Sequence, residues 1–419
     1  MLFALAAVPL IGLSGLGIEY TRALYFRTQL DRAMDAATVT AIATARDYIS
    51  TNPKSESDPT NSAKQLAEAR GLATFRVNAG SLLSQLSVLP SLTVSRTGGL
   101  ISATGTFETS YASAFGRLLG NTADIQISNK SLSSLTLGSF ADFYLLLDTS
   151  GSMGFPTSSA AQIQFAKLNP DDKDKSGNNC AFACHFPGYK GFDISKKYNI
   201  ELRIKTVSDS VQKLISKASS NQTFENQYRI GLYPFISYLE AAAEITKDFK
   251  SLASINLEDY MDIGSAKVPR GSGGTHYDNV LPAINKKVLA AGDGSSAQKP
   301  QAFVFLITDG MANGQYYNNG FDGSQPNLLD SSLCKPLKDR GITISVLYIP
   351  YVPLAKPFNT NVGDENNTVN NLIPSVPNRL KSCASSGFFR TASSATEIQE
   401  AMNAMFDQAT RKARLVGSL

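Results

Sequence analysis

Apolar residues gather first at the amino terminus, where the stretch from Met1 to Ile18 carries no charged side chain. This length is at the short edge of what a membrane span needs. Apolar residues then recur at steps of three and four, which predicts that one helix continues to about Asp47. This stripe consists of Ala23, Phe26, Leu30, Met34, Ala37 and Ala41. A helix of that length must pack against something, in this chain or in another.

The flanks of the apolar stretch bear on how it is used. The first charges after it are Glu19, Arg22 and Arg27, which is the wrong side for an anchor with its amino terminus inside. No basic segment precedes the stretch and no convincing cleavage site follows it, which disfavours a signal peptide. We therefore expect the natural amino terminus to lie upstream of Met1. A buried core helix is the alternative interpretation.

Residues 49–138 follow a different pattern. The segment Thr51–Asn61 is rich in Ser, Pro and Asn and predicts a linker. A partly helical stretch follows it. Residues 92–96 and 100–107 then alternate in polarity around Thr97-Gly98-Gly99, which predicts a β-hairpin. The sequence thus predicts a small α/β spacer domain over residues 49–138.

Strand and helix patterns alternate from Ala141 onward, which predicts one domain over residues 139–419. The continuous apolar runs at 143–147 and 302–307 are typical of buried parallel strands. The expected fold class is α/β, with a doubly wound, mainly parallel sheet and helices on both faces. An insertion at 154–197 interrupts the first strand-to-helix connection. We expect it to be an irregular loop with a recognition or lid role.

Composition changes this outline little. The chain has 419 residues, 42% of them hydrophobic, which suits two or three folded units. The net charge of +4, with 18% charged residues, is too mild to indicate nucleic-acid binding. Neither a phosphate-binding glycine loop with its lysine nor a Gly-x-Ser-x-Gly motif occurs.

Three short strings share one chemistry although they lie far apart in the chain. They are Asp148-Thr149-Ser150-Gly151-Ser152, Gly273-Gly274-Thr275 and Thr308-Asp309-Gly310. Two of them end an apolar run, and loops that leave the carboxyl ends of strands in such a sheet share one crevice. Two carboxylates and three hydroxyls would meet there. Such oxygen donors suit a hard divalent cation.

These strings resemble the metal-ion-dependent adhesion site of von Willebrand factor A domains. The resemblance implies that the metal ligands are Asp148, Ser150, Ser152, Thr275 and Asp309. It also implies Mg²⁺ as the cofactor, with Mn²⁺ or Ca²⁺ as other candidates. Because few carboxylates touch the ion, an Asp or Glu of a partner protein could supply its sixth ligand. The set contains no general base or histidine, so we expect binding and not enzymatic catalysis. A metal-dependent hydrolase is the less favoured alternative.

A second resemblance concerns the amino terminus. The strings from Gly15 to Arg22 and from Leu30 to Ala37 are similar to the first module of TadE/TadG-like proteins of Flp (tight adherence) pilus assembly. TadG-like proteins join this module to a von Willebrand A domain. The resemblance implies a membrane anchor and helical stalk at 1–48. It further implies a single-pass protein of the bacterial inner membrane, whose bulk is periplasmic or extracellular and meets other pilus assembly components. A surface adhesin that binds host or matrix ligands through the same site is the alternative.

The four cysteines are Cys180, Cys184, Cys334 and Cys383. An even number behind a membrane anchor suggests an oxidising compartment and two disulfides. Three pairings are possible. We favour Cys180–Cys184 with Cys334–Cys383, because the first two are close in sequence and lie in the insertion. The resemblance to TadG-like domains, which show a similar Cys-x-x-x-Cys-His string and a late pair, supports the same assignment.

Two further patterns fit metal sites poorly. Cys180, Cys184 and His185 would need a fourth ligand to bind zinc, and the only other histidine is His276. We expect His276 to be a solvent-exposed loop residue, although it follows Thr275 closely. The run that starts at Asp172 resembles the start of a calcium loop, but its twelfth position lacks the expected Glu.

Overall fold

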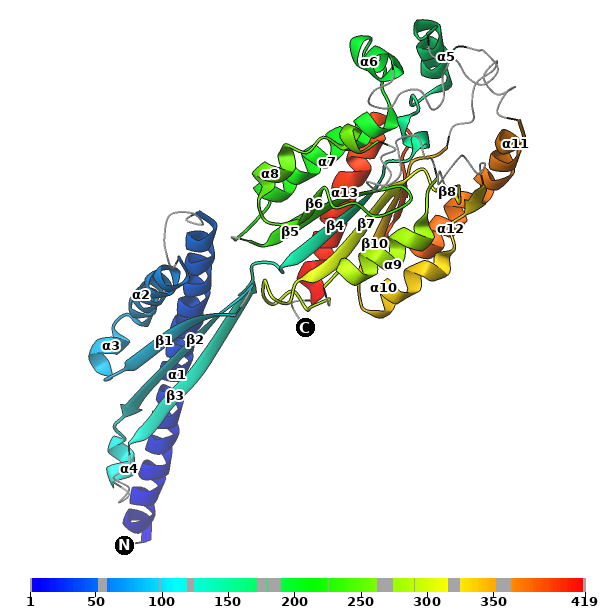
Figure 1. Cartoon of the computed structure of the whole chain (residues 1–419). Helices are drawn as coiled ribbons and strands as arrows, with labels where there is room; N and C mark the ends of the chain where they lie inside the picture. The colour runs from blue at the N-terminus through cyan, green and yellow to red at the C-terminus, as the bar shows by residue number, and fades with distance from the viewer. Residues whose placement is uncertain are drawn as a thin grey trace. The chain divides into compact units, whose positions relative to one another are not determined.

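The structure is a computed structural model. It describes residues 2–51, 59–97, 99–118, 124–171, 179, 190–224, 226–261, 274–289, 291–315, 325–351 and 363–416. The chain forms two compact units (Figure 1). The first unit holds residues 1–138 with 223–225, and the second holds residues 139–222 with 226–419.

The first unit is a long helix packed on a second helix and on a three-stranded antiparallel sheet with the order β1-β2-β3. All six residues of the predicted apolar stripe of α1 are buried, which confirms the amphipathic helix. The partner of this helix lies within the same unit. The elements are α1 (Leu2–Thr51), α2 (Pro59–Ala79), α3 (Leu82–Gln85), β1 (Leu89–Thr97), β2 (Leu100–Tyr111), α4 (Ala114–Leu118) and β3 (Ile125–Thr136).

Small side chains let α1 approach the sheet closely. A Cβ atom at Gly105 of β2 would lie 2.3 Å from the Sδ atom of Met34, so a larger residue there would displace the Met34 side chain. The hydroxyl of Thr38 bonds to Ser131 at 3.2 Å and to Ser133 at 2.8 Å, both on β3. The predicted hairpin is confirmed, because β1 and β2 pair in an antiparallel register that closes at residues 97 and 100.

The first unit also bears on the predicted membrane span. Within the described residues, no helix combines the length and the apolar composition that crossing a membrane requires. Helix α1 includes residues 2–9, but their side chains lie outside the described part of the chain. The membrane span at residues 1–18 stays a prediction.

The second unit is built on a six-stranded sheet with the order β11-β10-β7-β4-β5-β6. All neighbours are parallel except β6, which pairs antiparallel at one edge. This confirms the predicted doubly wound, mainly parallel sheet. The strands are β4 (Ala141–Asp148), β5 (Tyr228–Phe235), β6 (Ala243–Thr246), β7 (Gln301–Thr308), β10 (Thr343–Tyr348) and β11 (Phe389–Thr391).

Helices cover both faces of this sheet (Figure 1). Their apolar stripes form two separate cores, one with α7 and α13 and the other with α9, α10 and α12. The central strands β4 and β7 are buried along their whole length, which explains their unbroken apolar runs. The helices are α7 (Arg203–Ser220), α8 (Phe249–Ala253), α9 (Tyr277–Lys287), α10 (Lys335–Asp339), α11 (Gly363–Leu372), α12 (Val376–Cys383) and α13 (Ala395–Val416).

Shorter elements complete the second unit. Strands β8 (Met311–Asn313) and β9 (Pro326–Leu328) pair with each other in a small antiparallel ribbon. Single turns of 3₁₀ helix are η1 (Gly151–Gly154), η2 (Leu257–Tyr260), η3 (Ser331–Cys334) and η5 (Ile373–Ser375).

The insertion at 154–197 is more regular than predicted. It contains α5 (Ser159–Leu168) and α6 (Lys190–Lys197). The Ser158 side chain caps α5 by accepting a bond from the backbone N–H of Ala161. Phe165 of α5 and Ile200 form a small apolar cluster of their own. The prediction of an irregular loop is wrong for these two helices, because a local cap and a local apolar cluster stabilise them.

Candidate metal site

The first string lies at the carboxyl end of β4, where the buried apolar run ends. The Asp148 carboxylate accepts a bond from the backbone N–H of Ser150 at 3.0 Å, which turns the chain sharply into η1. The hydroxyls of Ser150 and Ser152 then lie 3.1 Å apart. The turn therefore gathers one carboxylate and two hydroxyls at the end of the strand.

The third string lies at the end of the neighbouring strand β7. Strands β4 and β7 run parallel with Leu147 opposite Ile307, so Asp148 and Asp309 leave the sheet side by side. Gly310 follows with a positive φ of 83°, and a Cβ atom there would lie 2.5 Å from a methyl group of Val376. Only glycine allows the chain to turn away so tightly after Asp309.

Thr275 reaches the same region through its backbone. Its N–H donates to the carbonyl of Asn313 at 2.9 Å, and the N–H of Asn313 donates back at 3.1 Å. Asn313 lies in β8, four residues after Asp309. Gly274 enters this bridge with a φ of +91°, and a Cβ atom there would lie 2.7 Å from the His276 ring. The bridge pins the Thr275 loop to the segment that follows Asp309.

The structure thus places the predicted ligands at one end of the sheet. Direct contacts link Asp148, Ser150 and Ser152, and electrostatic coupling links Asp148 to Asp309. Thr275 joins them through the β8 bridge and is 4% exposed. Whether these five residues bind a metal stays a prediction.

Burial raises the pKa of both carboxyl groups. The pKa of Asp148 rises to about 7, first because the group is removed from water and second because Asp309 lies close, while hydrogen bonds from Ser150 and Thr308 oppose the rise. The pKa of Asp309 is also raised by burial, against the opposing charge of Arg203 and a bond from Ser152. Two carboxylates that resist ionisation in this way would be stabilised by a cation.

Three residues of the site were not predicted from the sequence. The Thr308 hydroxyl donates to Asp148 Oδ2 at 2.5 Å, and the Tyr277 hydroxyl lies 2.6 Å from Thr308 Oγ. Since Thr308 gives its proton to the carboxylate, Tyr277 donates to Thr308. The third is Arg203, which is 1% exposed, and its Nη1 lies 3.3 Å from Asp309 Oδ2. Arg203 stands four residues before Val207 on an apolar helix stripe, a position where a charged residue is a usable signal.

The charges and the unpaired oxygen of the site fit a hard divalent cation. One guanidinium faces two carboxylates, which leaves the cluster short of positive charge. Asp309 Oδ1 is fully buried and has no hydrogen-bond partner among the described residues. Within that same part of the chain, no group of three or more His, Cys, Asp or Glu side chains forms a metal-binding cluster. Any cation here would therefore rely on hydroxyl oxygens besides the two carboxylates.

His276 differs from the prediction. It is 2% exposed, and its Nε2 lies 2.8 Å from the carbonyl of Gln315. The expectation of a solvent-exposed histidine is wrong, because the bridge between Thr275 and Asn313 draws the residue inward.

The late cysteine pair is confirmed. Cys334 and Cys383 form a buried disulfide with a Cα–Cα distance of 5.3 Å. It ties η3 to α12, the helix whose Val376 packs against Gly310. The disulfide therefore fixes a helix that supports the turn after Asp309. Cys180 and Cys184 lie outside the described residues, so their pairing stays a prediction.

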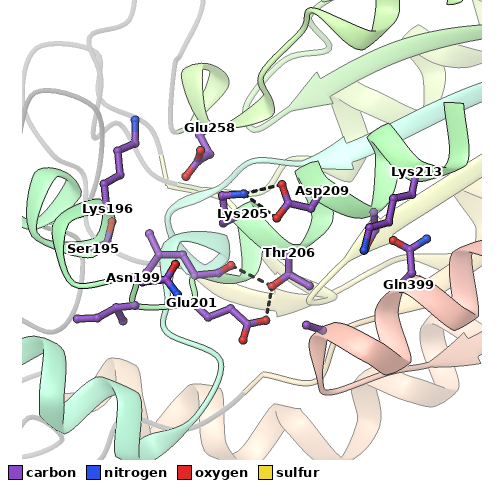
Figure 2. A pocket seen from close by; sticks show the side chains of 14 residues that line it. Ser195, Lys196, Asn199, Glu201, Lys205, Thr206, Asp209, Lys213, Glu258 and Gln399 are labelled. Atoms are coloured by element: carbon purple, nitrogen blue, oxygen red, sulfur yellow. Dashed lines mark hydrogen bonds and ion pairs between the residues drawn. The ribbon is translucent and has the colours of Figure 1, made fainter. Parts of the chain in front are cut away.

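A surface hollow of about 520 Å³ lies on the same unit between α6, α7, η2 and the start of α13 (Figure 2). Its polar side chains largely satisfy one another. Lys205 pairs with Asp209 at 2.5 Å, and Thr206 donates to Glu201 at 2.7 Å. None of the five predicted ligands lines this hollow.

Comparisons with known proteins give only remote likenesses. No protein-family profile matches the sequence, and no curated protein is similar to it. Among solved structures, the pilus adhesin SpaC from Lactobacillus rhamnosus GG is 13% identical with a TM-score of 0.38, over 78% of this chain and 34% of that one. The chain is also similar to the vWF domain of the type V pili tip protein Mfa5 from Porphyromonas gingivalis. That match is 13% identical with a TM-score of 0.37, over 66% of this chain and 97% of that one.

A third similar structure is proximal thread matrix protein 1 from the mussel byssus, described with a zinc-occupied MIDAS motif. It is 16% identical with a TM-score of 0.34, over 65% of this chain and 48% of that one. This chain thus spans about half the length of the byssus protein and a third of SpaC. Scores this low carry no argument about function, so the fold class rests on the strand order and the buried parallel strands described above.

Proposed function

We propose that the second unit binds a divalent cation through Asp148, Ser150, Ser152, Thr275 and Asp309. The observation that carries this proposal is the buried carboxylate pair at the ends of β4 and β7, faced by one guanidinium and surrounded by hydroxyls. Asp309 Oδ1, which no described residue satisfies, is the atom that most needs a cation. Mg²⁺ is the favoured ion, with Mn²⁺ and Ca²⁺ as alternatives.

The bound cation would hold an acidic side chain of a partner protein. When bound, the ion supplies an open coordination position that a carboxylate oxygen can fill. The residues of this chain hold the ion and keep its surroundings rigid. We propose a binding role and not an enzymatic one, because both carboxylates of the site are assigned to the cation. Nε2 of the neighbouring His276 lies 2.8 Å from the Gln315 carbonyl.

The wider setting of the proposal is a membrane-anchored, TadG-like component of Flp pilus assembly. The uncharged stretch at residues 1–18, from which α1 begins at Leu2, supports an anchor in the bacterial inner membrane. The disulfide between Cys334 and Cys383 supports an oxidising compartment, periplasmic or extracellular, for the second unit. A surface adhesin would use the same site. Fractionation of the producing cells separates the two, since an assembly component stays with the inner membrane.

A thermal melt of the full chain tests the metal site. A cation at a hundred times its dissociation constant adds about 2.7 kcal/mol to the free energy of unfolding. We expect Mg²⁺ or Mn²⁺ to raise the melting temperature of the wild type and not that of Asp309→Ala. Asp142→Asn is the matched control, because Asp142 is a buried carboxylate at the opposite end of β4. An equal metal-induced shift in wild type and Asp309→Ala would contradict the proposal.

A further inference from the structure

Arg203 is a buried charge whose polar contacts are to the candidate site. It is the first residue of α7 and is 1% exposed. Its Nη1 lies 3.3 Å from Asp309 Oδ2 and donates to the carbonyl of Ser152 at 3.4 Å. An arginine stays protonated in proteins even when it is buried. The site therefore contains one permanent positive charge of its own.

The position of this guanidinium is fixed. Its Cζ lies 5.8 Å from the ring centre of Phe155 and 5.7 Å from that of Tyr351, within the range of cation–π attraction. The backbone N–H of Arg203 also donates to the carbonyl of Phe155 at 3.0 Å, which ties the start of α7 to the segment after η1. The rings of Phe155 and Tyr351, which we call the aromatic slot, hold the guanidinium in place beside Asp309.

The ion pair with Asp309 is incomplete. Of the guanidinium nitrogens, only Nη1 contacts the carboxylate. Arg203 Nη2 and Asp309 Oδ1 are both buried without a hydrogen-bond partner among the described residues. A two-point ion pair exists elsewhere in the same sheet, since Arg229 of β5 donates to Asp142 of β4 through two bonds of 2.7 and 2.6 Å. The one-point contact leaves Asp309 Oδ1 open, whereas a bidentate contact would occupy both oxygens.

The charges of the loaded site follow from this geometry. Metal ligands bind in their deprotonated form, so Asp148 and Asp309 together contribute two negative charges. A divalent cation cancels them, and Arg203 leaves one positive charge in excess. No third acidic side chain joins the cluster within the described residues. In a buried site such an excess repels the cation and attracts an anion.

We propose that Arg203 determines specificity at this site, because its fixed charge makes the loaded site cationic. The cation alone then binds less tightly, and a carboxylate ligand binds it better. This inference rests on the proposed metal site and extends it. It couples the two ligands, since each improves the binding of the other by the same factor. Metal and acidic partner would thus bind together more readily than either binds alone.

Titration of the full chain with Mn²⁺ tests the coupling. The affinity is measured by calorimetry with and without acetate as the carboxylate probe, and with acetamide as its uncharged counterpart. In the wild type we expect acetate, but not acetamide, to tighten Mn²⁺ binding by a factor within about 5–150. In Arg203→Gln we expect Mn²⁺ alone to bind at least about fivefold more tightly. We expect acetate to tighten Mn²⁺ binding less than in the wild type, because the cation keeps its open coordination position but the excess positive charge is gone.

Matched variants keep this test specific. Arg203→Met fills the aromatic slot without a charge and replaces the Gln variant if that protein does not fold. Arg203→Lys keeps the charge, and we expect it to retain the acetate effect. Arg229→Gln removes an arginine at the start of β5, the end of the sheet away from the site, and should leave both affinities unchanged.

Different failures have different meanings. If the wild type binds no Mn²⁺, the proposed metal site is wrong and the inference falls with it. If the wild type binds Mn²⁺ but the uncharged Arg203 variants keep its affinity and its acetate effect, the metal site stands and the role of Arg203 is wrong. Weaker Mn²⁺ binding in Gln, Met and Lys variants alike would mean that Arg203 only maintains the structure.

Discussion

At the scale of single residues, the site depends on groups behind the predicted ligands. Thr308 donates to Asp148 Oδ2, Tyr277 donates to Thr308, and the N–H of Gly310 also donates to the Thr308 hydroxyl at 2.9 Å. These hydrogen bonds fix Oδ2 of Asp148, while the N–H of Ser150 fixes Oδ1. The orientation of Asp148 is therefore set partly by Thr308 and Tyr277, which are not among the proposed ligands.

Replacement of Thr308 by Val tests this support. The change keeps the shape of the side chain and removes the hydroxyl, so Asp148 Oδ2 loses its donor. We expect Mn²⁺ affinity to fall by about 10–100-fold, the usual effect of losing a residue that orients a metal ligand. Tyr277→Phe should cause a smaller loss, because it acts one bond further away. Calorimetric titration with Mn²⁺ measures both effects.

Tyr233→Phe is the control for these variants. Tyr233 is also a buried tyrosine, but its hydroxyl bonds to Glu244 at 2.9 Å and not to the site. Mn²⁺ affinity should be unchanged in this variant. Equal affinities in the wild type and Thr308→Val would show that Thr308 does not orient a metal ligand.

The sequence indicated the residues that end strands and missed those that reach the site from other elements. Asp148 and Asp309 each follow an apolar run, and strand ends in a parallel sheet converge by geometry. Arg203 enters from the start of α7 and Tyr277 from the start of α9. Their side chains meet the site only because of how these helices pack, which a linear pattern does not encode.

At the scale of secondary-structure elements, interactions between residues close in sequence explain best where helices begin. A capping box begins α13, because the Glu397 carboxylate accepts from the backbone N–H groups of Ser393 and Ser394. The helices α5 and α6 were missed, since their apolar cluster is small and flanked by polar sequence. The sequence also does not predict that α1 packs on the sheet of its own unit. An amphipathic stripe indicates that one face of a helix is buried, but it does not indicate which residues cover that face.

In the first unit, Glu19 connects α1 to the start of α4. This α1 residue accepts bonds from the Ser113 hydroxyl and from the backbone N–H groups of Ala114 and Phe115. It thereby satisfies donors at the start of α4. The Ser113 bond, followed by these backbone bonds, lowers the pKa of Glu19 below its ordinary value of 4.5, although burial opposes the shift. A lowered pKa means that the ionised form stabilises the fold.

The sign of the pH dependence follows from that shift. The stabilisation by Glu19 is present above pH 4.5 and is lost as the pH falls through the lower pKa of the folded state. We expect Glu19→Gln to lower the melting temperature of the first unit at neutral pH. The difference from the wild type should shrink below pH 4.5. Melting curves of both proteins across this range measure the effect.

Glu108→Gln is the control, because Glu108 is an exposed residue of β2. It should melt like the wild type throughout. A difference between wild type and Glu19→Gln that stays constant with pH would show that the carboxylate charge of Glu19 does not stabilise α4.

At the scale of the whole molecule, the chain forms two units with different architectures. The first is a long helix on an antiparallel sheet, and the second is a parallel sheet covered on both faces. The fold class of the second unit followed from its buried apolar runs, which parallel strands require. For that unit we propose that the ends of β4 and β7 form a divalent-cation site.

Diffraction from crystals of the full chain grown with Mn²⁺ tests this claim most directly, because the anomalous signal of manganese locates the ion. We expect a peak among the oxygen atoms of Asp148, Ser150, Ser152, Thr275 and Asp309, within about 2.6 Å of those that bind it directly. The peak should be lost in Asp309→Ala. No manganese at this end of the sheet under saturating Mn²⁺ would contradict the account.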